Sequence, residues 1–271
     1  MIAGKGGVGK STIAALLARQ LSRRGAPVVA VDADEQSNLG ATLGLDLERA
    51  ASLVPLAADV GYVEEKTGAR PGEGAGEMLR LNPDVTDVVE RMAVDAPDGV
   101  RLLVMGGVAR AGGGCLCPET ALLAATVRSM RLRRGEVVVM DTHAGVEHFG
   151  RSLALGFDEA VVVVDPTRNA VTVGQATARL AAELGISSVR LVVNRVREPA
   201  DAERVNGYLG LPDSGAGLSF SSVHLLPYDE RALADEPSVD RLLLGSPLAD
   251  AVDRLAGDLL GVAGDPWEVA R

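Results

Sequence analysis

The chain has 271 residues, and 47% of them are hydrophobic, which is enough to bury the core of one large domain or two small ones. A formal net charge of −10 and an aromatic content of only 3% disfavour nucleic-acid backbones, anionic membranes and single-stranded bases as binding partners. We therefore expect no nucleic-acid partner and no stable membrane association.

Short β-branched runs alternate with longer stretches of helical periodicity along most of the chain. This alternation is typical of β-α-β units, and the apolar strands are typical of a parallel sheet with helices on both faces. We expect strands at 27–32, 100–105, 136–141, 160–165, 189–194 and 222–226, preceded by a very short strand ahead of Gly4. Helices are expected at 10–24, 118–133, 146–155, 169–184, 202–209 and 247–260. The sequence therefore predicts a single-domain α/β fold with a mostly parallel sheet of about seven strands.

One region interrupts the alternation. Between residues 47 and 99 the sequence indicates only a Pro/Gly-rich loop at 70–76 and a helix near 83–93, so we interpret it as an insertion. The domain is expected to span residues 1–263, with 264–271 as a C-terminal tail.

A glycine-rich segment near the start fits the phosphate-binding pattern G-x-x-x-x-G-K-[ST] and opens a helical stretch. Glycines allow successive backbone N–H groups to face a phosphate, and the helix N-terminus favours an anion. Lys10 is expected to reach the β- and γ-phosphates, Ser11 to ligate Mg²⁺ through its hydroxyl, and Thr12 to donate to the α-phosphate. The predicted nucleotide-binding residues of this P-loop are Gly4, Lys5, Gly6, Gly7, Val8, Gly9, Lys10, Ser11 and Thr12.

Lysine is rare in this chain. Of its 27 cationic residues only three are lysines, Lys5, Lys10 and Lys66, and the others are arginines. Two of the three lysines lie in the glycine loop. The pair resembles the deviant Walker A motif K-G-G-x-G-K-[ST] of the MinD/ParA group of dimeric P-loop ATPases. That resemblance implies that Lys5 reaches the nucleotide of a partner subunit, so that hydrolysis is slow and depends on a homodimer.

Two of the predicted strands end in aspartate. The segment from Asp32 through Asp34 to Asn38 resembles the D-x-D-x-x-x-N switch I of the same group, in which Asp34 would orient the attacking water and Asp32 would support Mg²⁺. Asp141 begins a D-x-x-x-G motif, which resembles a Walker B and switch II segment that holds the metal through water. The alternative is that these aspartates only cap the helices that follow. The catalytic residues implied by the resemblance are Lys5, Lys10, Asp34 and Asp32.

The end of the expected strand at 189–194 bears on which nucleotide base is bound. Asn194 is not part of an N-K-x-D motif, whose aspartate reads guanine, so ATP is favoured over GTP. The family resemblance implies that adenine is flanked mainly by backbone groups of Asn194, Arg195, Pro227, Tyr228 and Asp229.

The two cysteines of the chain, Cys115 and Cys117, lie within one tripeptide between three glycines and a predicted helix. No stretch approaches the roughly 20 apolar residues of a transmembrane helix, and no secretory signal opens the sequence, so we expect a cytoplasmic protein. Thiols stay reduced there, which favours a metal-binding or redox role over a disulfide. Two sulfurs do not complete the coordination of a soft metal ion, but a two-fold dimer supplies four.

A narrower resemblance joins these features. The C-x-C-P-E run at 115–119, the segment 141–151 with its G-V-E-H-F-G-R sequence, and the segment 162–166 resemble the CooC-type ATPases, which are nickel-insertion accessory proteins of carbon monoxide dehydrogenase. The resemblance implies that Cys115 and Cys117 hold Ni²⁺ or Zn²⁺ across a homodimer that ATP switches. It also implies a client metalloenzyme such as carbon monoxide dehydrogenase. His143 departs from the pattern, since glutamate is expected there, and His148 is expected to order switch II rather than to bind metal.

Two other functions stay open at this point. A MinD- or ParA-like positioning ATPase is disfavoured by the acidic segment 253–260, which lacks the basic amphipathic face that binds anionic lipid. An iron–sulfur ATPase related to the nitrogenase iron protein is disfavoured because the cluster ligands of each subunit are far apart in sequence in that protein, unlike this adjacent pair.

Overall fold

The computed structural model describes residues 1–34, 36–70, 79–106, 117–130, 135–143, 156–210 and 220–261. Its strands are β1 (Ile2–Gly4), β2 (Val28–Ala33), β3 (Val94–Asp95), β4 (Arg101–Val104), β5 (Val137–Thr142), β6 (Glu159–Val164), β7 (Ser188–Val196) and β8 (Ser222–Pro227). Within the described part of the chain they form one eight-stranded sheet of order β3-β4-β2-β5-β1-β6-β7-β8. Only β3 runs antiparallel to its neighbour. The predicted α/β fold is confirmed, with one strand more than expected.

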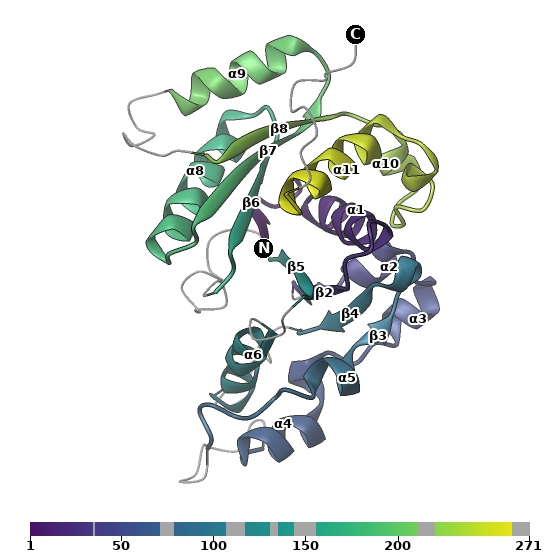
Figure 1. Ribbon diagram of the computed structural model, residues 1–271, viewed down its shortest axis with the longest axis vertical. Coiled ribbons are helices and arrows are strands. Elements are labelled where there is room, and N and C mark those ends of the chain that lie inside the picture. The colour runs from purple at the N-terminus through teal and green to yellow at the C-terminus, as the bar shows by residue number, and fades with distance from the viewer. Residues whose placement is uncertain are drawn as a thin grey trace.

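Helices cover both faces of this sheet. The long helices are α1 (Lys10–Arg23), α6 (Cys117–Met130), α8 (Arg168–Glu183), α9 (Pro199–Leu209) and α11 (Pro247–Leu259). Figure 1 shows α1 and α11 side by side on one face, with α6 and α8 on the other. The shorter elements are α2 (Leu39–Leu43), α3 (Leu47–Ala51), α4 (Val60–Thr67), α5 (Val88–Met92), α10 (Arg231–Ala234) and the 3₁₀ turns η1 (Leu56–Ala58), η2 (Pro97–Gly99) and η4 (Leu242–Leu244).

The central strands are buried on both faces, which explains their apolar runs. Every residue from Ala160 to Val164 of β6 is buried, as are Val28 to Val31 of β2. Burial on both faces requires a helix layer on each side, because either exposed face would leave a row of valines in water. The continuous apolar runs that predicted these strands therefore reflect their burial under two helix layers.

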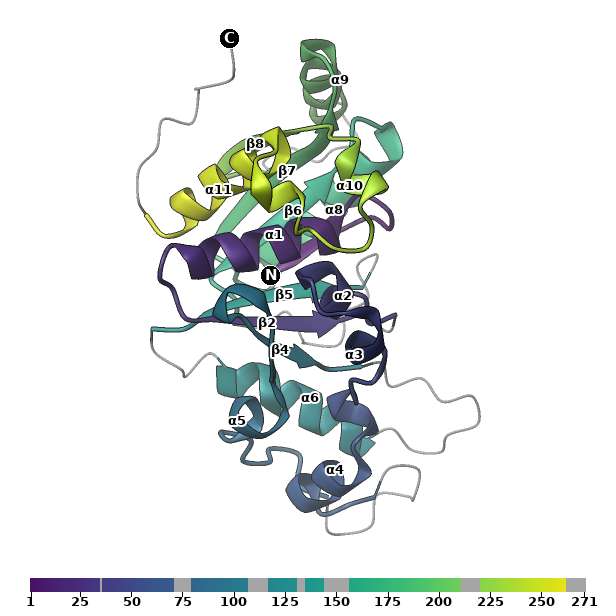
Figure 2. The ribbon, with the colours of Figure 1, turned by 90° about the vertical axis from the view of Figure 1, so that its right-hand side faces the viewer.

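Residues 47–99 contain several short elements at the far edge of the sheet. Figure 2 shows α4 and α5 beyond β4, next to α6, and α4 packs against α6. The helix expected near 83–93 is shorter than predicted, since α5 covers only Val88–Met92. The two-residue strand β3 was not predicted, because two residues carry no readable alternation. The helix expected at 146–155 and the tail at 264–271 lie outside the described residues.

A buried arginine of α1 ties three distant segments together. The Nε of Arg19 donates to Asp98 at 2.6 Å, and its Nη1 donates to the Leu43 carbonyl at 3.1 Å and to Asp240. Two carboxylates and a carbonyl therefore compensate for the burial of this guanidinium. The network fixes η2 and the segment after α10 against the helix that follows the glycine loop.

No helix in the described ranges combines the length and apolar character needed to cross a lipid bilayer.

Two mid-helix glycines give a test of how tightly the helix layer packs on the sheet. A Cβ at Gly174 of α8 would lie 2.5 Å from Cγ1 of Val164, whereas a Cβ at Gly207 of α9 would meet no atom within 4 Å. Gly207→Ala is expected to raise the free energy of unfolding by about 0.5–1 kcal/mol, because alanine favours the helix. Gly174→Ala is expected to lower it by about 1–3 kcal/mol through overpacking against β6. Urea denaturation of the two variants measures the difference, and equal stabilisation by both would contradict this account of the packing.

Candidate functional site

The glycine loop joins β1 to α1 at the carboxyl edge of the sheet. Gly4 has φ 148° and pairs with Val163 of β6, and a Cβ at Gly4 would lie 2.2 Å from the Val163 carbonyl oxygen. Gly9 adopts a left-handed conformation with φ 96° at the N-terminus of α1. Both positions therefore require glycine, and the loop leaves the sheet in a fixed direction.

Asn194 at the end of β7 also holds this loop. It is buried, and its Nδ2 donates to the Val8 carbonyl at 2.8 Å. A Cβ at Gly9 would lie 2.5 Å from the same Nδ2. The backbone N–H of Arg195 donates back to Asn194 Oδ1 at 2.9 Å, which fixes the orientation of the amide. Sequence reasoning placed Asn194 beside the base, and the structure adds this contact with the loop.

Lys10 is buried at the first position of α1. Its Nζ donates to the backbone carbonyl of Lys5 at 3.3 Å. Burial lowers the pKa of Lys10, while the carboxylates of Asp141 and Asp34 act in the opposite direction. The ammonium group of Lys10 therefore faces a cluster of acidic groups from within the loop.

Two of those acidic groups stand side by side in the sheet. Asp32 of β2 and Asp141 of β5 are direct partners in the parallel register, and both are fully buried. Burial raises the pKa of Asp32 to about 6, although hydrogen bonds from the backbone N–H groups of Leu39 and Asp34 act to lower it. Burial also raises the pKa of Asp141 to about 7, although the Ser11 hydroxyl beside it lowers it.

This cluster has the composition of a site for a hard divalent cation. Within the described residues, Asp141 Oδ1 is buried and has no hydrogen-bond partner. Carboxylate and hydroxyl oxygens suit Mg²⁺, which proteins bind through one or two carboxylates together with waters and substrate phosphates. Across the described ranges, no three His, Cys, Asp or Glu side chains gather closely enough to enclose a metal ion by themselves. The residues present therefore fit a cation that is bound jointly with a phosphate.

Asp34 and His143 are the residues that directly follow the last pair of β2 and β5. Ala33 pairs with Thr142, and the next residues along the two strands are in contact, with His143 Nδ1 3.0 Å from Asp34 Oδ1. Burial of Asp34 raises its pKa, but hydrogen bonds from the Gln36 N–H and His143 outweigh this effect and lower the pKa overall. Sequence reasoning noted His143 only as a departure from the motif, and the register of β2 and β5 is the signal that would have revealed the contact.

The residues expected around adenine line one hollow beside the loop. Its wall contains all five of the predicted residues, and the rest of its lining comes from the glycine loop, α1 and the C-terminal part of the chain. The predicted residues there are Asn194, Arg195, Pro227, Tyr228 and Asp229, and they meet Gly9, Thr12, Ile13, Ala232, Leu233, Glu236 and Leu248. The structure thus brings the ends of β7 and β8 together with the loop, as the family resemblance implied.

Two side chains at this hollow are already engaged by neighbours. The Arg197 guanidinium lies 3.6 Å from the centroid of the Tyr228 ring, a cation–π contact that sequence reasoning missed. Arg231 donates to both oxygens of Asp229, at 2.9 and 2.8 Å, and this pairing lowers the pKa of Asp229. The expectation that backbone groups make most of the contacts with adenine stays a prediction.

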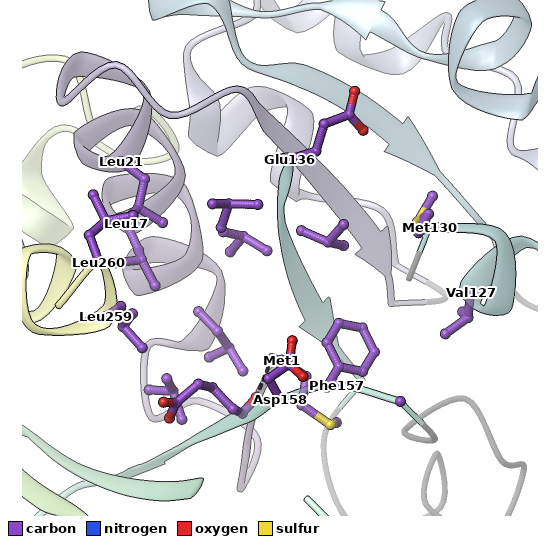
Figure 3. A pocket seen from close by; sticks show the side chains of 17 residues that line it. Met1, Leu17, Leu21, Val127, Met130, Glu136, Phe157, Asp158, Leu259 and Leu260 are labelled. Carbon is purple, nitrogen blue, oxygen red and sulfur yellow. Dashed lines mark hydrogen bonds between the residues drawn. The ribbon is translucent and has the colours of Figure 1, made fainter. Parts of the chain in front are cut away.

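A larger cavity of about 430 Å³, lined by apolar side chains together with Glu136, Asp158 and Glu159, lies at the opposite end of the sheet (Figure 3). It is bounded by Leu17 and Leu21 of α1 on one side and by Val127 and Met130 of α6 on the other. β1 meets β5 at the single pair Ile2 and Asp141, so the first residues of β5 face this space. Its position at the other end of β1 and β5 separates it from the acidic cluster at the carboxyl edge.

The cysteine pair lies largely beyond what the structure describes. Cys115 is outside the described residues, and of Cys117, the first residue of α6, only the backbone is described. The part of switch II that follows His143, including His148, also falls outside. The proposed metal ligands therefore stay a prediction.

Comparisons with known proteins place the chain in a family. The CbiA family, described as the CobQ/CobB/MinD/ParA nucleotide binding domain, matches residues 1–232. The carbon monoxide dehydrogenase accessory protein CooC of Rhodospirillum rubrum is 41% identical over 200 residues, which cover 74% of this chain and 75% of CooC. An uncharacterised ATP-binding protein of Methanocaldococcus jannaschii is 34% identical over 254 residues, or 94% of each chain.

Solved structures agree with this placement at the level of the fold. The septum site-determining protein MinD of Pyrococcus horikoshii, complexed with Mg-ADP, superposes with a TM-score of 0.67 at 20% identity, covering 99% of this chain and 98% of MinD. The resemblance drawn from the glycine loop, the aspartate motifs and the C-x-C-P run is confirmed by the sequence relatives. The chain belongs to the CobQ/CobB/MinD/ParA nucleotide-binding family, and within it to the CooC-type members of the MinD/ParA ATPase group.

Proposed function

We propose that the protein is a homodimeric ATPase that binds a soft metal ion, nickel in the first place, and delivers it to a client metalloenzyme such as carbon monoxide dehydrogenase. The observation that carries this proposal is the convergence of Lys10, Ser11, Asp32 and Asp141 at the glycine loop. It occurs in a chain that also contains the C-x-C-P run and whose relative CooC is named as an accessory protein of carbon monoxide dehydrogenase. The ATPase domain is proposed to span residues 1–263, including the insertion at 47–99.

The nucleotide would lie along the loop with its phosphates at the N-terminus of α1. Backbone N–H groups from Gly4 to Thr12 would face the phosphates, and Lys10 would exchange its contact with the Lys5 carbonyl for the β- and γ-phosphates. Adenine would occupy the hollow between the ends of β7 and β8.

Ser11, Asp32 and Asp141 would hold Mg²⁺ against the β- and γ-phosphates. The ion supplies positive charge that neutralises the phosphate oxygens as the bond to the leaving group breaks. Asp34 at the end of β2 would accept a hydrogen bond from the attacking water and orient it in line with that bond. Asp34 is suited to this task because its low pKa keeps it ionised and able to accept.

Lys5 would explain why hydrolysis requires a dimer. It belongs to a chain that otherwise uses arginine for nearly all cations, and its carbonyl already contacts Lys10. A second subunit that lends this ammonium group would add charge to the γ-phosphate region only in the dimer, so that hydrolysis would be slow in the monomer.

Separate substitution of the three lysines tests these roles. Lys10→Ala is expected to abolish nucleotide binding, whereas Lys5→Ala is expected to retain binding but to lose ATP-driven dimerisation and at least about 100-fold in hydrolysis rate. Lys66→Ala is the matched control, because Lys66 pairs with Asp87 on the insertion, 2.8 Å away. Fluorescent-nucleotide titration, light scattering with and without ATP, and phosphate release measure the three properties. Normal turnover in Lys5→Ala would show that its assignment is wrong.

The buried carboxylate of Asp141 gives a second test. In the absence of Mg²⁺ and nucleotide at pH 8, Asp141→Asn is expected to raise the melting temperature by about 2–4 °C or more, because a carboxylate with a pKa near 7 is then ionised in a buried position. The same variant is expected to lose the stabilisation that Mg-ATP gives the wild type. Asp158→Asn, which changes an exposed aspartate, serves as the control. A variant that melts below the wild type without ligand would contradict the proposed electrostatics.

Metal transport would be the work of Cys115 and Cys117. Thiolates are soft ligands that suit Ni²⁺ or Zn²⁺, and α6 begins at Cys117, where a helix N-terminus lowers a thiol pKa. Two sulfurs from each subunit complete a four-coordinate site on the dimer axis. The metal ion is thus cargo shared by the same two chains that share the nucleotide.

Equilibrium dialysis against Ni²⁺ and Zn²⁺ tests this part of the proposal. Anaerobically reduced protein is expected to bind one ion per dimer, and the double variant Cys115→Ser/Cys117→Ser is expected to lose at least about 100-fold in affinity. His148→Gln is the control and is expected to bind normally. Unchanged binding in the double variant would rule out the cysteine site, and a brown, iron-containing anaerobic preparation would favour an iron–sulfur ATPase instead.

A further inference from the structure

His143 stands directly after β5, and the residue it touches stands directly after β2. Its Nδ1 lies 3.0 Å from Oδ1 of Asp34, in continuation of the register that pairs Ala33 with Thr142. The two side chains therefore meet because their strands are neighbours, and the contact does not depend on a surface loop folding back.

The hydrogen bonds to the Asp34 carboxylate are one-sided. Its Oδ1 accepts from His143 Nδ1 at 3.0 Å and from the Gln36 backbone N–H at 3.0 Å, and in the described ranges every hydrogen bond to this carboxylate goes to Oδ1. Two donors on one oxygen fix the plane of the carboxylate and leave Oδ2 for a solvent molecule. Asp34 is 23% exposed, so water reaches it.

The tautomer of His143 follows from its partner. An ionised carboxylate only accepts hydrogen bonds, so Nδ1 must carry the proton that lies between the two groups. His143 is 45% exposed, which gives its Nε2 side access to solvent. The imidazole thus acts as a donor to Asp34 whether it is neutral or charged.

We propose that His143 is a positioning residue for ATP hydrolysis, which holds Asp34 Oδ1 through Nδ1–H so that Oδ2 faces the attacking water. This inference rests on the proposed function, because it takes from it the role of Asp34 as the group that orients water. Among the described residues, the side-chain hydrogen bond of His143 goes to Asp34, and His143 does not line the hollow beside the loop, so we infer that it acts on the reaction through Asp34. A change at His143 therefore alters turnover and leaves nucleotide affinity intact.

Two isosteric substitutions separate the donor from the bulk of the side chain. The Asn side-chain amide can be oriented to present its N–H₂ where Nδ1 now lies, whereas Leu has similar size and no donor. His143→Leu is expected to lower kcat about 10- to 100-fold, the effect of losing one hydrogen bond to a charged group. His143→Asn is expected to stay within about threefold of the wild type. KM for ATP, nucleotide affinity and melting temperature are expected to stay unchanged in both.

A double-mutant cycle identifies the group through which His143 acts. In an Asp34→Asn background, His143→Leu is expected to cause no further loss of kcat, because the carboxylate that it positions is gone. Should His143→Leu fail to fold, His143→Gln, which moves the amide donor outward by one bond, replaces it in the comparison with His143→Asn.

The outcomes distinguish this role from the function on which it depends. Wild-type kcat in His143→Leu, equal losses in the Leu and Asn variants, or a full further loss in the Asp34→Asn background would each overturn the positioning role while leaving the ATPase proposal in place. If the wild-type dimer with Mg-ATP releases no phosphate at all, the proposed function fails and this role fails with it.

Discussion

The site depends on two buried carboxylates that lie directly opposite each other on neighbouring strands and whose negative charge must be compensated. Asp32 and Asp141 are direct neighbours across β2 and β5, and the raised pKa of each shows how poorly their burial suits negative charge. Lys10 and Ser11 face them from α1, and the lysine compensates for only part of that charge. A cation bound together with a phosphate would compensate for the remaining negative charge, and this electrostatic balance would couple nucleotide binding to the core of the sheet.

The position of the glycine loop depends on that same sheet. Gly4 lies so close to the Val163 carbonyl that no side chain fits, and Asn194 donates a hydrogen bond to the Val8 carbonyl. The loop is thus held by residues of β6 and β7 on one side of β1, while the acidic groups approach from β5 and β2 on the other side. Because all four of these strands are parallel to β1, their carboxyl ends converge on the start of α1.

Sequence patterns predicted the parts of this arrangement that are long or chemically specific. The buried strands, the long helices and the glycine loop could be predicted because valine-rich runs and glycines at fixed spacing are compatible with few other structures. The strand β3 and the short helices α2 to α4 were not, since two to eight residues carry too little periodicity. The contact between Asp34 and His143 needed the strand order, because residues that far apart in the chain reveal their contact only once β2 and β5 are known to pair.

The same topology relates the cysteine pair to the phosphate site. β4, α6 and β5 form one β-α-β unit, and Val104 at the end of β4 pairs with Asp32, so this unit leaves the sheet at the carboxyl edge. Cys115 lies in the chain between β4 and α6 and Cys117 begins α6, while Asp141 lies near the end of β5 and His143 directly follows that strand. A parallel arrangement returns both ends of such a unit to one edge of the sheet. The proposed cargo site and the proposed switch therefore belong to a single structural unit.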